Sequence, residues 1–249
     1  MAGPLSATPA PMPLKAMIFA AGRGDRMRPL TDSTPKPLLP VAGKPLIVWQ
    51  IEALARAGYI DIVINHAWLG AQIEAALGDG SRFGVHLTYS AEAEALETAG
   101  GIVQARPYLE GAGNVFLAIA GDLFTDFDFA TLRAPAARLA ARAQPGMHLV
   151  MVPNPPFHPA GDFALDAAHR LHLRENAPPG AVPLTFGSIA LYDLRLFDGI
   201  APGTRMALTP LYQRTIADAR ATGERFDGEW ENVGTPAQLA ALNDIVSAR

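Results

Sequence analysis

The stretch from Lys15 to Pro45 reads KAMIFAAGRGDRMRPLTDSTPKPLLPVAGKP. It begins with a short apolar segment, residues 16–20, which predicts a β-strand leading into a turn that contains Gly22 and Gly24. Glycine adopts positive φ angles without a Cβ clash, so its backbone can lie directly against a ligand. Successive backbone N–H groups in such a turn form a concavity that binds anions. We therefore interpret the loop as one that presents N–H groups to a triphosphate.

Cationic side chains accompany these glycines. Guanidinium groups form forked hydrogen bonds to phosphate oxygens, and prolines on both sides of Lys36 restrict its backbone, so the ammonium group is directed. Between Lys15 and Lys44 six Lys and Arg residues stand against two Asp residues, in a chain whose formal net charge is −4. A basic island in an acidic chain favours a small anionic ligand over a nucleic-acid surface. The other cations of the island are Arg23, Arg26 and Arg28.

Two common phosphate-binding patterns are absent from this loop. A Walker loop requires GK[ST] after its glycines, whereas Asp25 follows Gly24, and GxGxxG fails because Met27 stands three residues beyond Gly24. The whole run instead resembles the sugar nucleotidyltransferase family, whose pattern is approximately GxGxRxxPxTxxxPKPxxPVxxKP. The positions that match in order are Gly22, Gly24, Arg26, Pro29, Thr31, Pro35, Lys36, Pro37, Pro40, Val41, Lys44 and Pro45.

The resemblance implies a single in-line displacement, in which the phosphate of a sugar 1-phosphate attacks the α-phosphorus of an NTP and pyrophosphate leaves. It implies that Arg26 and Lys36 are catalytic, with Arg26 on the leaving phosphates and Lys36 on the α-phosphate or the attacking phosphate. The run EALETAGGI, residues 94–102, resembles the family's base-reading segment, although Glu97 stands where a glycine is frequent. Ordinary helix capping by Thr98 is the alternative. The nucleotide-binding residues expected from the resemblance are Ala20, Ala21, Gly22, Gly24, Arg26, Glu94, Thr98 and Gly100.

A magnesium site is also expected. Asp122 ends a buried apolar run, residues 115–120, and Mg²⁺ prefers oxygen ligands and keeps waters and substrate phosphates. The second metal aspartate of the family lies in a late DVGT motif, where this chain has Asn232. Three outcomes are open: the Asn232 amide binds the ion, the site is weakened, or a local twist brings in Glu231, which strand alternation places on the opposite face. We favour the first, so the expected ligands are Asp122 and Asn232.

Further runs, including NHAWLG and LTFGSIALY, resemble one subgroup, the N-acetylmuramate-1-phosphate uridylyltransferases of cell-wall (peptidoglycan) recycling. The subgroup implies UTP and N-acetylmuramic acid 1-phosphate as substrates, with Asn65, Asn154, Asp162 and Gly187 near the sugar. A mannose-1-phosphate guanylyltransferase and a glucose-1-phosphate thymidylyltransferase are alternatives. A non-catalytic nucleotide-binding subunit is a third, because Asn232 departs from the family pattern.

Apolar strands and helical patterns alternate along the chain, which predicts a mostly parallel sheet covered by helices. With the resemblance, the fold class is α/β: a single-domain, Rossmann-like, three-layer nucleotidyltransferase fold with a mostly parallel mixed sheet. We expect a disordered extension at 1–14 and one domain at 15–249, with a nucleotide-binding half (15–152) and a sugar-binding half (153–249). Predicted strands are 16–20, 61–65, 85–89, 115–120, 148–152, 164–166, 171–174, 184–191, 225–227 and 229–233. Predicted helices are 46–57, 71–77, 100–106 (broken by Pro107), 130–143 (capped by Asp128), 209–221 and 236–248 (capped by Thr235).

Composition bounds the remaining classes. The 249 residues are 49% hydrophobic, which is ample for a core, and the absence of cysteine excludes disulfides and thiolate metal sites. The first fourteen residues lack the basic start and apolar run of a signal peptide, and no apolar run approaches the length of a membrane span. We therefore expect a cytoplasmic protein with no membrane or nucleic-acid partner. The sequence predicts no particular oligomeric state.

Overall fold

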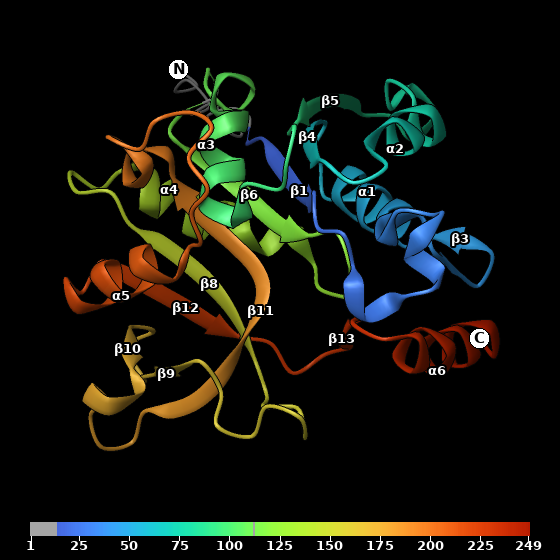
Figure 1. Cartoon of the computed structure of the whole chain (residues 1–249). Helices are drawn as coiled ribbons and strands as arrows, with labels where there is room; N and C mark the ends of the chain where they lie inside the picture. Colours follow the sequence, from blue (N-terminus) through green and yellow to red (C-terminus); the bar gives the residue numbers. More distant parts are fainter. Residues whose placement is uncertain (1–13, 112) are drawn as a thin grey trace, which may run out of the picture.

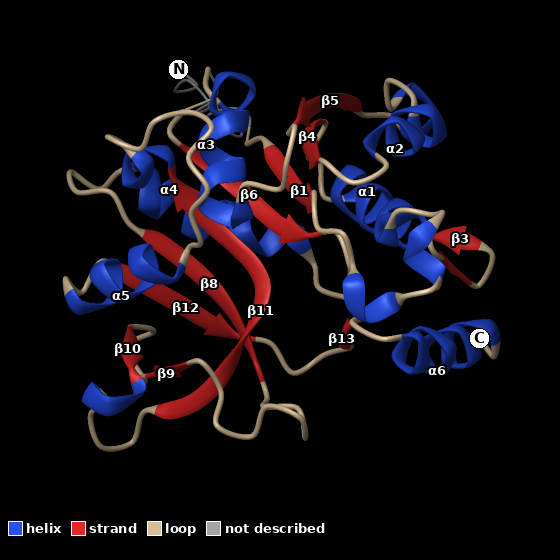
Figure 2. Ribbon diagram, viewed as in Figure 1, coloured by secondary structure: helices blue, strands red, loops and turns tan. Residues whose placement is uncertain are grey.

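A computed structural model describes residues 14–111 and 113–249 as three layers, with helices on both faces of a mixed sheet (Figures 1 and 2). The extension predicted at 1–14 lies, except for Leu14, outside the described residues, and Leu14 itself is buried in the core. The strands are β1 (Ala16–Ala20), β2 (Pro40–Val41), β3 (Lys44–Pro45), β4 (Asp61–His66), β5 (His86–Ala91), β6 (Val115–Ala120), β7 (Leu123–Thr125), β8 (Met147–Val152), β9 (Phe163–Leu165), β10 (Leu171–Leu173), β11 (Val182–Asp193), β12 (Ala221–Arg225) and β13 (Trp230–Asn232). The α-helices are α1 (Leu46–Arg56), α2 (Gly70–Leu77), α3 (Glu97–Leu109), α4 (Arg133–Ala140), α5 (Thr209–Ala217) and α6 (Pro236–Ser247).

Within the described residues, nine strands form one sheet. Its main path runs β10-β9-β11-β6-β1-β4-β5, β8 pairs with β11, and β12 pairs with β8. The pairs β1–β4, β1–β6, β4–β5 and β8–β12 are parallel, whereas β11 runs antiparallel to β6, β8 and β9. The predicted α/β fold with a mixed, mostly parallel sheet is therefore confirmed.

The two faces of the sheet have separate apolar cores because side chains alternate along each strand. In β1, Ile18 packs with residues of α1, α2 and α4, and Met17 packs on the other face with residues of α3 and α5. A third cluster joins α6 to the segment after β1, where Leu239 and Leu242 pack with Met27. Figure 1 shows α6 at the C-terminal end of the chain, beside β13 and that segment. The C-terminal helix thus supports the glycine loop.

Several helix predictions were wrong in detail. We predicted that the third helix stops before Pro107, but α3 continues to Leu109. Pro107 lies in the last turn, so its missing N–H costs a single hydrogen bond at the end of the helix. The predicted 130–143 helix begins with a 3₁₀ turn, where the Asp128 side chain accepts from the N–H of Ala130, and α4 proper starts at Arg133.

The region after α5 also differs from the prediction. We expected a helix to residue 221 and a strand at 225–227, but α5 ends at Ala217 and β12 spans Ala221–Arg225. Ala219 adopts a left-handed φ of 53° between them, which a continuing α-helix does not allow. The Thr235 cap of α6 is confirmed, since its side chain accepts from the N–H of Gln238. Among the residues described, no helix combines the length and apolar character needed to cross a bilayer.

Candidate active site

A cleft of about 610 Å³ opens where β1 and β6 end. Parallel strands of α/β sheets place ligands beyond their carboxyl ends, so this is the expected position for a substrate site. Nine of the residues singled out from the sequence line it: Ala20, Ala21, Gly22, Gly24, Arg26, Lys36, Asn65, Thr98 and Asp122. The remaining predicted residues, Glu94, Gly100, Asn154, Asp162, Gly187 and Asn232, lie outside its lining.

The glycine loop is folded back on the residues that follow it. Gly24 has a φ of 71°, and an added Cβ there would lie 3.1 Å from Cγ2 of Thr31 and 3.2 Å from Cβ of Lys36. The Thr31 hydroxyl donates to the carbonyl of Gly24 at 2.9 Å. Gly24 is therefore required both for its left-handed backbone and for its close packing. Nothing lies within 4 Å of a Cβ built on Gly22, so that position is open to the cleft.

An ion pair in the cleft joins Lys36 to Asp122. The ammonium group donates to Oδ2 of the carboxylate, and the two side chains are 11% and 25% exposed. Arg26 lies nearby, because a Cβ built on Gly234 would stand 3.4 Å from its Nη2. The cleft is therefore lined by two cations, Lys36 paired with Asp122 and Arg26 beside Gly234, and both can receive phosphate oxygens.

Asn232 lies beside Asp122 through a strand pair. β13 runs antiparallel to β7 with Asn232 opposite Leu123, and the N–H of Val233 donates to the carbonyl of Asp122 at 3.0 Å. Oδ1 of Asn232 is buried and has no hydrogen-bond partner among the described residues. A buried acceptor left unpaired costs about 1–3 kcal/mol, and an amide oxygen is a suitable Mg²⁺ ligand. Asp122 and Asn232 are thus oxygen donors of the kind that Mg²⁺ prefers, and the described residues contain no cluster of three or more His, Cys, Asp or Glu side chains that could hold a metal.

Glu231 points away from this pair. It is exposed, as the alternation along β13 predicts. Partial desolvation, and then the neighbouring Glu229, raise the pKa of Glu231.

The predicted base segment is fixed by a distant part of the chain. The N–H groups of Ala99 and Gly100 both donate to the carbonyl of Met206, at 2.9 and 3.0 Å, and the N–H of Met206 donates to Leu96. No side chain caps α3, so Thr98 does not serve as its cap and faces the cleft. A Cβ on Gly100 would stand 2.2 Å from the carbonyl oxygen of Thr204, so this glycine serves packing.

Of the four predicted sugar residues, only Asn65 lines the cleft, and both ends of its amide are used within the protein. Oδ1 accepts from the N–H of Ala20 at 3.1 Å, and Nδ2 donates to the buried carboxylate of Glu92 at 2.6 Å. This bridge fixes the end of β1 to the segment after β5. We infer that Asn65 positions the glycine loop.

The other three predicted sugar residues gather around β11. Asp162 accepts from the N–H of Phe186 at 2.8 Å, and Asn154 accepts from the hydroxyl of Thr185 at 2.9 Å. The carbonyl of Gly187 accepts from the indole of Trp230 at 2.8 Å. A Cβ on Gly187 would lie 3.1 Å from the carbonyl oxygen of Val150. These residues hold β11 in place at the point where its register with β8 shifts.

A second cavity of about 300 Å³ adjoins the cleft and was not predicted. It shares Phe19, Thr98 and Ala120 with the cleft and continues to Phe186 and Tyr212. Burial raises the pKa of Tyr212 far above its ordinary value, and its hydroxyl meets that of Tyr192 at 2.6 Å. The LTFGSIALY run contains the β11 part of this wall, but α5 joins it only through the tertiary fold.

The rim of the cleft carries a cation that sequence reasoning also missed. Arg205 is 73% exposed and lies 3.1 Å from the carboxylate of Glu97. Glu97 has a φ of 63°, in the left-handed region where glycine is favoured. The family pattern frequently has a glycine at the position of Glu97, and this was the feature of the sequence that could have predicted the left-handed backbone.

Comparisons with known proteins agree with this geometry. Residues 15–158 match the nucleotidyl transferase family. An N-acetylmuramate alpha-1-phosphate uridylyltransferase of Neisseria meningitidis is 48% identical over 94% of this chain and 99% of its own length. A Caulobacter vibrioides protein of the same name is 33% identical over 95% of this chain and 98% of its own. A Bacillus anthracis protein crystallised with sucrose has the same fold, with a TM-score of 0.77 at 21% identity over 95% and 96% of the two chains.

Proposed function

This chain belongs to the nucleotidyl transferase family, and we propose that it transfers the uridylyl group of UTP to N-acetylmuramic acid 1-phosphate. It is a sugar-1-phosphate nucleotidyltransferase, in agreement with the two relatives matched over nearly their whole length. The observation that carries the proposal is the cleft itself, in which Arg26, Lys36 and Asp122 meet the glycine loop beside a second, more apolar cavity. The product would return a cell-wall sugar to its nucleotide-activated form.

The reaction needs alignment of two anions and no general base. A phosphate monoester is already largely dianionic near neutral pH, so its oxygen is a ready nucleophile for the α-phosphorus. The open backbone at Gly22 is suited to receive the triphosphate, with the guanidinium of Arg26 on the leaving phosphates. Lys36 lies deeper and would contact the α-phosphate or the attacking phosphate. These fixed cations offset the repulsion between the reactants and hold them in line.

Asp122 and Asn232 are the residues that would hold Mg²⁺. The ion would supply positive charge to the phosphate oxygens when bound. The family's aspartate at the second position is an amide here, so this pair contributes a single negative charge. The unpaired Oδ1 of Asn232 supports this assignment.

Recognition of the nucleobase is assigned to the segment that begins α3. Thr98 is partly buried and lines the cleft, and its side chain is not used as a helix cap. The main-chain hydrogen bonds that join Met206 to Leu96, Ala99 and Gly100 fix the backbone of this segment. A uracil edge could therefore meet a rigid main chain and one hydroxyl.

The acceptor sugar is assigned to the second cavity. N-acetylmuramic acid carries an acetamido methyl group and a lactyl carboxylate, which call for an apolar wall and a cation respectively. Phe186 and Tyr212 offer the wall, and Arg205 stands on the rim of the adjoining cleft. Asn154, Asp162 and Gly187 would act on the sugar indirectly, through the position of β11.

A substrate matrix tests the proposal. UTP, GTP and dTTP are each combined with the 1-phosphates of N-acetylmuramic acid, N-acetylglucosamine, mannose and glucose, and pyrophosphate release is measured. UTP with N-acetylmuramic acid 1-phosphate should give the highest kcat/KM. A preference for GTP with mannose 1-phosphate, or for dTTP with glucose 1-phosphate, would refute the assignment, and the absence of turnover with every pair would favour a binding subunit.

Arg205 provides a second, sharper test. In Arg205→Gln the kcat/KM for N-acetylmuramic acid 1-phosphate should fall about tenfold, the value of one charge-assisted contact. The value for N-acetylglucosamine 1-phosphate, which lacks the lactyl carboxylate, should be unchanged. An equal loss with both acceptors would show that Arg205 does not recognise that carboxylate.

A further inference from the structure

A separate cleft of about 390 Å³ lies on the face of the sheet that carries α4. Its walls are the end of α4, the neighbouring strands β8 and β12, and the turn between β9 and β10. It shares no lining residue with the cleft at the ends of β1 and β6. Its volume lies in the range of small-molecule sites, roughly 300–1,000 Å³.

Two arginines and two histidines line this cleft, against the single carboxylate of Glu224. They are Arg138, Arg142, His148 and His169. Arg138 is exposed, and its guanidinium makes no ion pair or hydrogen bond with another described residue. A cluster of guanidinium and imidazole groups in a concave site is suited to phosphate.

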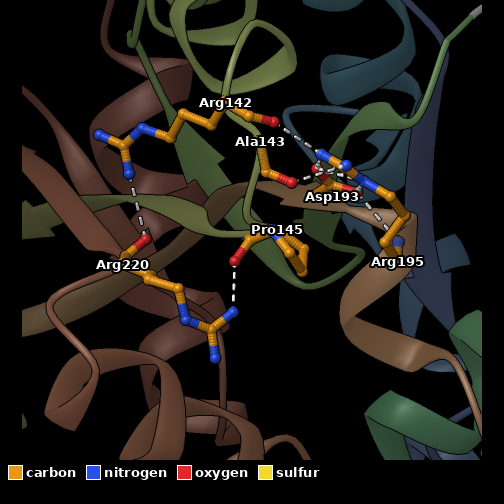
Figure 3. A network of polar contacts seen from close by, with 6 residues as sticks. All are labelled: Arg142, Ala143, Pro145, Asp193, Arg195 and Arg220. Atoms are coloured by element: carbon orange, nitrogen blue, oxygen red, sulfur yellow. Dashed lines mark hydrogen bonds and ion pairs between the residues drawn. The ribbon is translucent and has the colours of Figure 1, made fainter.

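The position of Arg142 is fixed by a network that crosses three elements (Figure 3). Arg195, which pairs with the fully buried Asp193, donates to the main-chain carbonyls of Arg142 and Ala143 at 3.1 and 3.2 Å. Arg142 in turn donates from Nη1 to the carbonyl of Arg220 at 3.3 Å. This contact occupies one guanidinium nitrogen of Arg142, so other N–H groups are left for a ligand.

The floor of the cleft contains a histidine that is not fully used by the fold. His148 is 6% exposed, and Nδ1 lies 2.9 Å from the hydroxyl of Thr222 on the neighbouring strand. Nε2 has no hydrogen-bond partner in the described part of the chain and lies 3.6 Å from the carboxylate of Glu224. A buried nitrogen without a partner is costly and points to a group that the protein alone does not supply.

Glu224 limits the kind of ligand. Its side chain is 27% exposed, and a carboxylate beside a bound phosphate would repel it unless a hydroxyl group lies between them. A ligand that carries both groups satisfies the arginines and the carboxylate together. We propose that this cleft binds a small phosphorylated sugar or polyol. Its phosphate would contact Arg138 and Arg142 above His148, and one of its hydroxyl groups would donate a hydrogen bond to the carboxylate of Glu224.

Calorimetric titration of the full-length protein with glucose 6-phosphate tests the site, with glucose as the probe that lacks the phosphate. Glucose 6-phosphate should bind and glucose should not. Arg138→Gln should raise the Kd about tenfold. Arg56→Gln, which removes the same charge from an exposed position on α1 outside this cleft, should change it by less than about twofold.

NMR signals of the histidine side chains show where the ligand binds. With ¹³C-labelled histidine, glucose 6-phosphate should shift the ε1 signals of His148 and His169 and leave His66, at the end of β4, unmoved. Absence of binding heat, equal affinity in the two arginine variants, or shifts confined to His66 would overturn the proposal. Turnover of UTP in Arg138→Gln should equal that of the parent. The binding site and the proposed function are therefore tested independently.

Discussion

Replacing Asn232 by aspartate restores the residue that the family pattern carries, and it should make the fold depend on a divalent cation. Oδ1 of Asn232 is buried without a hydrogen-bond partner in the described chain, and the next residue, Val233, donates its N–H to the carbonyl of Asp122. A carboxylate at this position adds a second negative charge beside that of Asp122, which is already paired with Lys36. Among the described residues the ion pair at this site is Lys36 with Asp122, so without a metal ion the second charge has no ion-pair partner in the present arrangement.

The expected cost follows from burial of an uncompensated polar group, roughly 2 kcal/mol. For a domain of this size, each kcal/mol lowers Tm by about 2–4 °C, so the variant should melt about 4–8 °C below the parent in EDTA. A ligand at 100 times its Kd stabilises the native state by about 2.7 kcal/mol. Saturating MgCl₂ should therefore remove most of the difference in Tm between Asn232→Asp and the parent, because it should raise the Tm of the variant more than that of the parent.

Thermal melts in EDTA and in a series of MgCl₂ concentrations make the measurement without any substrate. Glu231→Gln is the matched control, because Glu231 is exposed on the opposite face of β13, and its Mg²⁺ response should equal the parent's. Identical melting of Asn232→Asp and the parent in EDTA, with no extra response to Mg²⁺, would remove Asn232 from the metal site. A lost response in Glu231→Gln would assign the ligand to Glu231 instead.

Three further outcomes are expected. Lys36→Ala should lower kcat by about 10²–10³ with an unchanged circular dichroism spectrum, because a fixed charge at the reacting phosphates is lost; near-normal turnover would contradict this role. Glu97→Gly should raise the free energy of unfolding by up to about 1 kcal/mol, because glycine adopts the left-handed φ without strain and only an exposed ion pair with Arg205 is lost. Glu97→Ala should not raise the free energy of unfolding, and urea titration of both variants measures the difference. Tyr59 donates to a main-chain carbonyl at 3.1 Å, and burial raises its pKa from 10.0 to about 12. The folded state holds this proton more tightly, so the stability it contributes is complete below pH 10 and is lost as pH rises toward 12; Tyr59→Phe should flatten that part of the pH profile, and an equally steep loss would contradict it.

Much of the structure of residues 15–152, the predicted nucleotide-binding half, could be predicted because its signals are local. β1 and β6 have the predicted bounds, since each is a short apolar run with a glycine within two residues of its end. The caps at Asp128 and Thr235 were also found, because a capping side chain acts within three residues. The glycine loop and Asp122 meet in one cleft because both follow strands that end at the same edge.

Residues 153–249, the predicted sugar-binding half, were harder because long-range contacts determine their structure. Asn154 and Asp162 have the composition of ligand residues, but their hydrogen bonds go to β11. Tyr212 comes from α5 and reaches the second cavity only through the packing of that helix. Periodicity alone could not place a boundary at Ala219, where the backbone conformation departs from the helix. A pattern of residue types does not show which of these partners the chain will choose.

β11 determines the order in which the chain can assemble. β8 precedes β11 by about thirty residues, yet its described partners are β11 and β12, and β6 has β11 as its outer neighbour. As the ribosome delivers the polypeptide from its N-terminus, β6 and β8 emerge before the strand that joins them. The central sheet closes only after residues from Val182 onward are available, so a nascent chain that pauses earlier exposes bare strand edges to its neighbours. Splitting the protein near Val152, for complementation or reporter fusions, would produce the same exposed edges, whereas cuts that keep β6, β8 and β11 on one fragment would not.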